Sequence, residues 1–94
     1  MGDVQADSSK FFAALSSPLR IRMIQELSVK SMEVNKLVHV MGRERTLVSK
    51  NLKILLKARL VRVEKRGKHR RYHANMKITP LVFKFIEKIS CETK

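Results

Sequence analysis

Several side chains between residues 45 and 53 could donate hydrogen bonds or form ion pairs from one side of a helix: Arg45, Thr46, Ser49, Lys50 and Lys53. Among them Val48, Leu52 and Leu55 recur at i, i+4 and i+7, which is the spacing of a helix with one apolar face. The polar side carries short hydroxyl groups and cations. Groups of these kinds donate to the edges of bases and neutralise phosphates. We therefore predict that this helix presents its polar face to a polyanion.

The positive charge of the chain is concentrated around this segment. The 94 residues include 21 Lys and Arg against 8 Asp and Glu, which gives a net charge of +13. Residues 43 to 73 hold 12 of the basic and 2 of the acidic residues, so 12 − 2 = +10 of the charge lies in one third of the chain. A solvated surface usually mixes both signs, whereas a dense basic block favours a nucleic acid partner.

The preceding residues supply the scaffold for this helix. Ser17 and Pro18 predict an N-cap and first position for a helix over 18–29. Ser31 predicts the cap of a further helix, and Gly42 predicts its end, because glycine accepts the left-handed conformation just past a helix. The segment from residue 45 to 57 then forms the next helix.

The hydrophobic period changes from that of a helix to that of a strand after Ala58. Val61, Val63, Tyr72 and Ala74 alternate in strand fashion around the turn-forming "RGK", which predicts a hairpin with a cationic tip. Two outer helices complete the pattern. One follows a cap at Asp7 or Ser8, and the other follows "ITP" at 78–80 and runs to Ile89.

The order helix, turn, helix and basic hairpin is that of a winged helix-turn-helix. The major groove of B-DNA is about 12 Å wide and admits one α-helix, so the apolar face can hold the helix on its scaffold while the polar face reads bases. The base-contacting residues that we predict are Arg45, Thr46, Ser49 and Lys50. The residues predicted to contact phosphate, or to reach a flanking groove from the hairpin, are Lys36, Arg43, Lys53, Arg66, Lys68, His69 and Arg70.

The two outer helices carry more apolar surface than a chain of this length can cover. Phe83, Phe85, Ile86 and Ile89 wrap too far around the last helix to face a single core, which favours a two-fold dimer interface over a deeply buried helix. The predicted interface residues are Phe11, Phe12, Leu15, Phe83, Ile86 and Ile89.

Three segments, in order and at matching spacing, resemble one family. "LSSPLRIRMIQEL" is similar to the helix opening of the ArsR/SmtB-type winged-helix regulators, "TLVSKNLKILLKARLV" resembles their recognition segment, and "RGKHRRYHA" resembles their wing. The likeness covers about residues 12 to 75. It implies a homodimeric transcription regulator, usually a repressor, that pairs through its first and last helices.

The sequence departs from that family at positions that matter. The Cys-containing segment of the metal-sensing members reads "SMEVNKL" here, and the last helix offers Glu87 alone, so we predict neither a metal site nor a cofactor. Glu44 stands where a Ser usually begins the recognition helix. Arg59 replaces the Gly before "LV", so the turn into the first strand should be built differently.

Other chemistries find little support. There is no catalytic triad, no Gly-rich phosphate loop and no apolar run long enough to cross a bilayer, so we predict neither an enzyme nor a membrane protein. His69 and His73 lie on one strand face, but the surrounding cations argue against a metal pair. The single cysteine, Cys91, fits a reducing, cytoplasmic setting. Whether a small-molecule effector binds is left open.

We therefore expect an α+β, mostly α-helical winged helix-turn-helix with a two-stranded basic wing. One domain would span residues 1–94, with a flexible tail at 1–6, dimerisation helices at 7–16 and 79–90, the helix-turn-helix at 31–57 and the wing at 60–75. The expected partners are double-stranded DNA and a second copy of the chain, and the expected function is sequence-specific regulation of transcription, by repression. An architectural DNA-binding protein and a protein–protein interaction module remain alternatives.

Overall fold

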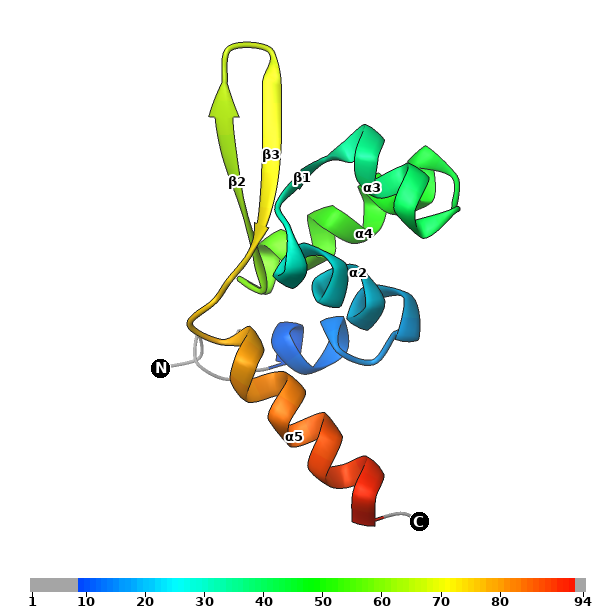
Figure 1. Ribbon diagram of the computed structural model, residues 1–94, viewed down its shortest axis with the longest axis vertical. Coiled ribbons are helices and arrows are strands. Elements are labelled where there is room, and N and C mark those ends of the chain that lie inside the picture. The colour runs from blue at the N-terminus through cyan, green and yellow to red at the C-terminus, as the bar shows by residue number, and fades with distance from the viewer. Residues whose placement is uncertain (1–8, 93–94) are drawn as a thin grey trace.

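The computed structural model describes the backbone of residues 9–92 and the side chains of residues 9–88. A short helical segment at 9–14 precedes the other elements. These are α2 (Pro18–Val29), β1 (Met32–Glu33), α3 (Val34–Met41), α4 (Arg45–Lys57), β2 (Val61–Arg66), β3 (His69–Ala74) and α5 (Thr79–Glu92). The hairpin of β2 and β3 lies at one end of the longest axis and α5 at the other, with the remaining helices between them (Figure 1). The predicted α+β, mostly helical winged helix-turn-helix is confirmed.

The helix boundaries follow local signals in the sequence. The hydroxyl of Ser17 accepts a hydrogen bond from the backbone N–H of Arg20, and Pro18 occupies the first helical turn. Gly42 ends α3 in the left-handed conformation, with φ of 64°, and donates to the carbonyl of Val38. The predicted caps at Ser17 and Gly42 are therefore both confirmed.

The prediction that Ser31 caps the next helix is wrong. Met32 and Glu33 instead form a short strand, β1, that pairs antiparallel with β3, so α3 begins only at Val34. Met32 is buried opposite Tyr72, and pairing with β3 satisfies backbone groups that a helix start would leave without partners. The sheet accordingly has three strands in the order β1-β3-β2, and the two-stranded wing is its projecting part.

The wing has the predicted hairpin form. Val61 pairs with Ala74 at its base and Arg66 with His69 at its tip, and Gly67, with φ of 60°, lies in the two-residue turn. Tyr72 and Ala74 point to the sheet face that packs on the helices, whereas Arg71 and His73 point to the opposite face.

The core lies where the apolar faces of α2, α3 and α4 meet the base of the sheet. Val48, Leu52 and Leu55 of α4 are all at most 2% exposed, which confirms the predicted apolar face. Met23, Ile24 and Leu37 from the two preceding helices belong to the same cluster. Burial of this side of α4 fixes which of its residues face outward.

The connection from α4 to β2 departs from ordinary backbone geometry. Arg59 adopts a left-handed conformation with φ of 62°. The carbonyl of Arg59 accepts a hydrogen bond of 2.8 Å from the side chain of Asn75, and the N–H of Asn75 donates to the carbonyl of Leu60. The expectation that replacement of glycine changes the build of this turn is therefore not confirmed: Arg59 keeps the left-handed conformation that glycine adopts without strain.

Among the described helices, none combines the length and the apolar character that crossing a membrane requires. The predicted tail at residues 1–6, and the caps proposed at Asp7 and Ser8, lie outside the described residues.

Candidate nucleic-acid interface

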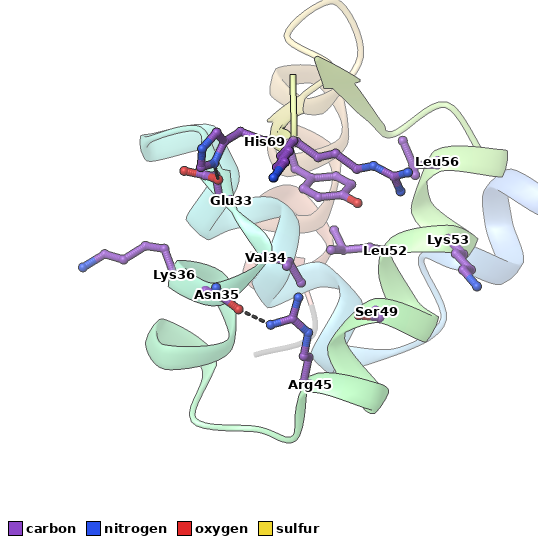
Figure 2. A pocket seen from close by; sticks show the side chains of 13 residues that line it. Glu33, Val34, Asn35, Lys36, Arg45, Ser49, Leu52, Lys53, Leu56 and His69 are labelled. Carbon is purple, nitrogen blue, oxygen red and sulfur yellow. Dashed lines mark hydrogen bonds and ion pairs between the residues drawn. The ribbon is translucent and has the colours of Figure 1, made fainter. Parts of the chain in front are cut away.

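The outer face of α4 forms one wall of an open cleft. The cleft has a volume of about 970 Å³ and is bounded by α4, the start of α3 and the wing. Arg45, Ser49 and Lys53 line it from α4, and Lys36 lines it from α3 (Figure 2). Its floor includes Leu52 and Tyr72, so the polar groups surround an apolar base.

A second, smaller hollow of about 400 Å³ lies on the same helix. Its lining consists of Arg45, Thr46, Ser49, Lys50 and Lys53. All the residues predicted to contact bases therefore lie on one accessible face of α4, opposite the buried stripe. Three residues belong to both hollows and mark the ridge between them: Arg45, Ser49 and Lys53.

Arg45 is held by a neighbour within the protein. Its guanidinium donates to the side-chain carbonyl of Asn35, which projects from the first turn of α3 (Figure 2). The contact leaves the other N–H groups of Arg45 available, since a guanidinium has five. Asn35 thus restricts the orientation of a side chain that we predicted to contact bases.

Asn35, Glu33 and Tyr72 belong to the cleft but were not predicted as site residues. The sequence did not predict Asn35 because it placed the start of this helix at Ser31. The helix begins at Val34, so Asn35 lies in its first turn. Glu33 lies in β1, and only its pairing with β3 brings it beside the wing.

The cationic residues of the wing divide between its two faces. Lys68 and Arg70 line the cleft together with α4. Arg66 lies on the opposite side, where its guanidinium is 3.1 Å from the carboxylate of Glu64 and is 82% exposed. Arg43 is exposed but borders neither hollow of α4. The structure therefore brings Lys68, His69 and Arg70 together with Arg45 and Ser49, and leaves Arg66 and Arg43 apart from them.

Each wing histidine is partnered by a different carboxylate. His69 Nδ1 lies 2.8 Å from Glu33 Oε1, which ties the tip of the wing to β1, and His73 Nε2 lies 3.3 Å from Glu64 Oε1. The hydrogen bond from His73, followed by the charge of Arg66, holds the pKa of Glu64 below its ordinary value of 4.5. Within the described residues, no cluster of three or more His, Cys, Asp or Glu could hold a metal ion.

A separate apolar groove lies on the far side of the molecule from the wing. It has a volume of about 600 Å³, and its lining is Phe11, Phe12, Leu15, Ile21, Ile78, Leu81, Val82, Phe85 and Ile86. Phe12, Leu81 and Phe85 are 69%, 68% and 65% exposed, which is unusual for large apolar side chains.

The predicted interface residues overlap this groove only in part. Phe11, Phe12, Leu15 and Ile86 line it, whereas Phe83 is half-buried and packs on the core. The side chain of Ile89 lies outside the described residues. Leu81 and Phe85 are the exposed large apolar residues of α5 among the described side chains, and the predicted interface did not include them.

No protein-family model matches the sequence, and a search of curated proteins gives no significant match. Solved structures do match. The winged helix-turn-helix DNA-binding domain of Mb0332 from Mycobacterium bovis, described as homodimeric and as a possible ArsR-family transcriptional regulator, superimposes with a TM-score of 0.84 at 19% identity, over 97% of this chain and 84% of that one.

Two further structures extend this likeness. An ArsR-like transcriptional regulator from Rhodococcus sp. RHA1 is 27% identical, with a TM-score of 0.75 over 96% of this chain and 85% of that one. The transcriptional repressor PagR of Bacillus anthracis is 16% identical, with a TM-score of 0.73 over 90% of this chain and 99% of that one. All three are regulators by description, and none is described as an enzyme. The resemblance drawn from the three sequence segments is confirmed, and the chain has the winged helix-turn-helix fold of the ArsR-type regulators.

Proposed function

We propose that this chain is a homodimeric, sequence-specific DNA-binding protein that represses transcription by occupying a promoter. The observation that carries the proposal is the division of α4 into two faces. One face is buried in the core, and the other opens, with its hydroxyl and cationic groups, into a cleft shared with the wing. An ordinary surface helix also has a buried and a polar face. What distinguishes α4 is that it carries no Asp or Glu, and that its cations and hydroxyls share the cleft with cations of the wing.

Each side chain has a role that follows from its place. Arg45, Thr46, Ser49 and Lys50 lie along the exposed face of α4 and would meet base edges in the major groove. Lys36, Lys53, Lys68 and Arg70 surround that face and would contact phosphate. A homodimer would place two such faces on one duplex, which calls for a pseudo-palindromic site. The homodimeric description of the Mb0332 domain and the repressor description of PagR support these finer points.

The first test is selection of binding sites from random duplexes. A regulator should enrich a pseudo-palindromic site and bind it about 10³-fold or more tightly than unrelated DNA. Affinity should also fall about 10³-fold between 50 and 200 mM salt, because a dimer contacts six or more phosphates. Salt-dependent binding without enrichment would favour an architectural protein.

The second test removes charge from the wing. In K68A/R70A, affinity for all duplexes should fall and the salt dependence should weaken by about one phosphate contact for each cation removed. The matched control is R22A/K30A, which removes two exposed cations of α2 and its C-cap, outside both hollows. Unchanged binding in K68A/R70A would favour the remaining alternative, a protein–protein interaction module.

A further inference from the structure

Asn51 lies on the wrong side of α4 for a polar residue. It is 5% exposed and belongs to the inward face, beside Val48, Leu52 and Leu55. Its side-chain N–H group donates to the carbonyl of Leu47 at 2.8 Å, which is a bond within the helix. Its side-chain oxygen is bound by a residue from another helix, Arg20 of α2, at 2.9 Å.

Arg20 joins three elements through one guanidinium. Besides Asn51, its Nε donates to the carbonyl of Ala14 at 2.8 Å, and its Nη2 donates to the carbonyl of Ala13 at 3.0 Å. These carbonyls lie at the end of the helical segment 9–14. That of Ala13 also accepts from the backbone N–H of Ser16 at 3.1 Å and from the hydroxyl of Ser16 at 2.6 Å. The planar, rigid guanidinium fixes the directions of all three bonds, which a lysine could not do.

The two ends of this bridge lie in parts of the molecule with different roles. Segment 9–14 carries Phe11 and Phe12, which line the apolar groove together with α5. In Figure 1 this segment lies between α2 and α5. The other end of the bridge is the middle turn of α4, whose opposite face opens into the candidate DNA-binding cleft.

We propose that Arg20 and Asn51 are positioning residues that fix the recognition helix relative to the dimer interface. This inference rests on the proposed function, since it requires a homodimer that places two α4 helices on one duplex. The buried amide is hydrogen-bonded through both its oxygen and its nitrogen, whereas an apolar residue could fill the same space without directional bonds, so we assign the amide to orientation. Its bond to Arg20 ties the direction of α4 to the segment that carries the interface.

The link between the recognition helix and the dimer interface can be tested with duplexes that differ in the spacing of their half-sites. A rigid link between interface and recognition helix makes the dimer strict about spacing, because a shift of one base pair moves and rotates the second half-site. A loose link lets each helix adjust on its own. Loss of the bridge should therefore lower the affinity for the best site. It should also lower the ratio of that affinity to the affinity for sites with a different half-site spacing.

The experiment compares the affinity of wild type and N51L for the selected site and for versions with one base pair added or removed at its centre. N51L severs the bond to α4 and keeps those between Arg20 and the segment 9–14. We expect affinity for the best site to fall by about tenfold, because binding must then order a helix that the bridge held in advance, and the preference for the best spacing to fall with it. The dimer should persist in sedimentation, since the groove is untouched.

Two further variants separate positioning from stability. N51D keeps an acceptor for Arg20, so it should restore the spacing preference even if its charge weakens all binding equally. R20M removes the guanidinium from the bridge and should lower the spacing preference as N51L does. It provides the test if N51L fails to fold. R22M, with the same loss of charge at an exposed site of α2, should keep the wild-type preference.

The outcomes distinguish the two proposals. If wild type prefers one spacing and both N51L and R20M retain that preference within twofold, the positioning role is overturned and the DNA-binding function stands. If wild type shows no preference among spacings or sites, the proposed function itself fails and the positioning role fails with it.

Discussion

Ser49 decides whether the open face of α4 admits a negatively charged partner. Its side chain is half-buried and borders both hollows of the helix, so any duplex docked there passes close to its hydroxyl. We expect S49E to lower affinity for the selected duplex by at least a hundredfold, because it places a carboxylate against phosphates and base acceptors in a poorly solvated groove. Fluorescence anisotropy with a labelled duplex measures the loss.

The fold should tolerate this change, because the side chain of Ser49 opens toward solvent. Thermal melting followed by circular dichroism should give a midpoint close to that of wild type. Q25E is a matched control, since it adds the same charge at an exposed position of α2. A collapsed melting curve for S49E would mean that Ser49 belongs to the core and that the orientation assigned to α4 is wrong.

Glu64 makes the stability of the wing depend on pH. The hydrogen bond from His73, and then the charge of Arg66, lower the pKa of Glu64 in the folded state. A carboxyl with a lowered pKa stabilises the fold above the unfolded value of 4.5 and loses that contribution as the pH falls through the folded value. E64Q should therefore melt below wild type at neutral pH.

The two melting curves of this pair should converge on acidification. Once the pH falls below the lowered pKa of Glu64, wild type itself becomes protonated there, so the difference from E64Q should shrink toward zero. E87Q, which alters an exposed carboxylate on α5, should show a smaller difference at neutral pH. A constant gap between wild type and E64Q from pH 7 to pH 3 would show that the carboxylate charge is not what stabilises the wing.

At the scale of elements, local signals predicted the helices and missed the third strand. Ser17 and Gly42 specify helix ends through groups within a few residues, so the sequence alone reveals them. Met32 and Glu33 become a strand only because β3 lies beside them, and β3 is about 40 residues further along the chain. A helix start at Ser31 satisfies every local rule, and only the pairing with β3 overrides it.

The candidate site divides in the same way. The open face of α4 was predictable because its apolar residues recur on one side of the helix, so the polar residues must occupy the other side. The contact between Asn35 and Arg45, and the separation of Arg66 from Arg70, depend on how α3 and the sheet are placed. Sequence periodicity does not carry that information.

The turn from α4 to β2 is a strained element that one substitution should relieve. Arg59 has a φ of 62°, where an L side chain crowds the following carbonyl and glycine does not. R59G should raise the free energy of unfolding by about 0.5–1 kcal/mol, because relief of this strain exceeds the added entropy of the unfolded chain. Urea denaturation gives the value directly.

Arg62 provides the control for this prediction. It is an exposed arginine in β2 without the left-handed backbone, and R62G should destabilise by about 0.5–1 kcal/mol, since glycine weakens a strand. If R59G is destabilising as well, the left-handed conformation at Arg59 carries no strain that glycine can release.

At the scale of the whole molecule, a charged face and an apolar groove lie at a distance from each other. The cleft of α4 and the wing is the proposed site for a duplex, and the groove beside α5 exposes Phe12, Leu81 and Phe85. Burial of the groove against its copy removes these rings from water and places two clefts on one assembly. Dimerisation and DNA binding are therefore expected to depend on each other.

F85E tests this dependence. The carboxylate would lie in the middle of the apolar groove, so we expect sedimentation to show a monomer where wild type is a dimer. Each monomer could then hold one half-site only, and affinity for the full site should fall by about a hundredfold or more, since the second contact is no longer intramolecular. K84E, on the neighbouring position of α5 but outside the groove, should remain dimeric. A dimeric F85E would place the interface elsewhere, whereas a monomeric F85E with full affinity would show that one recognition helix is sufficient.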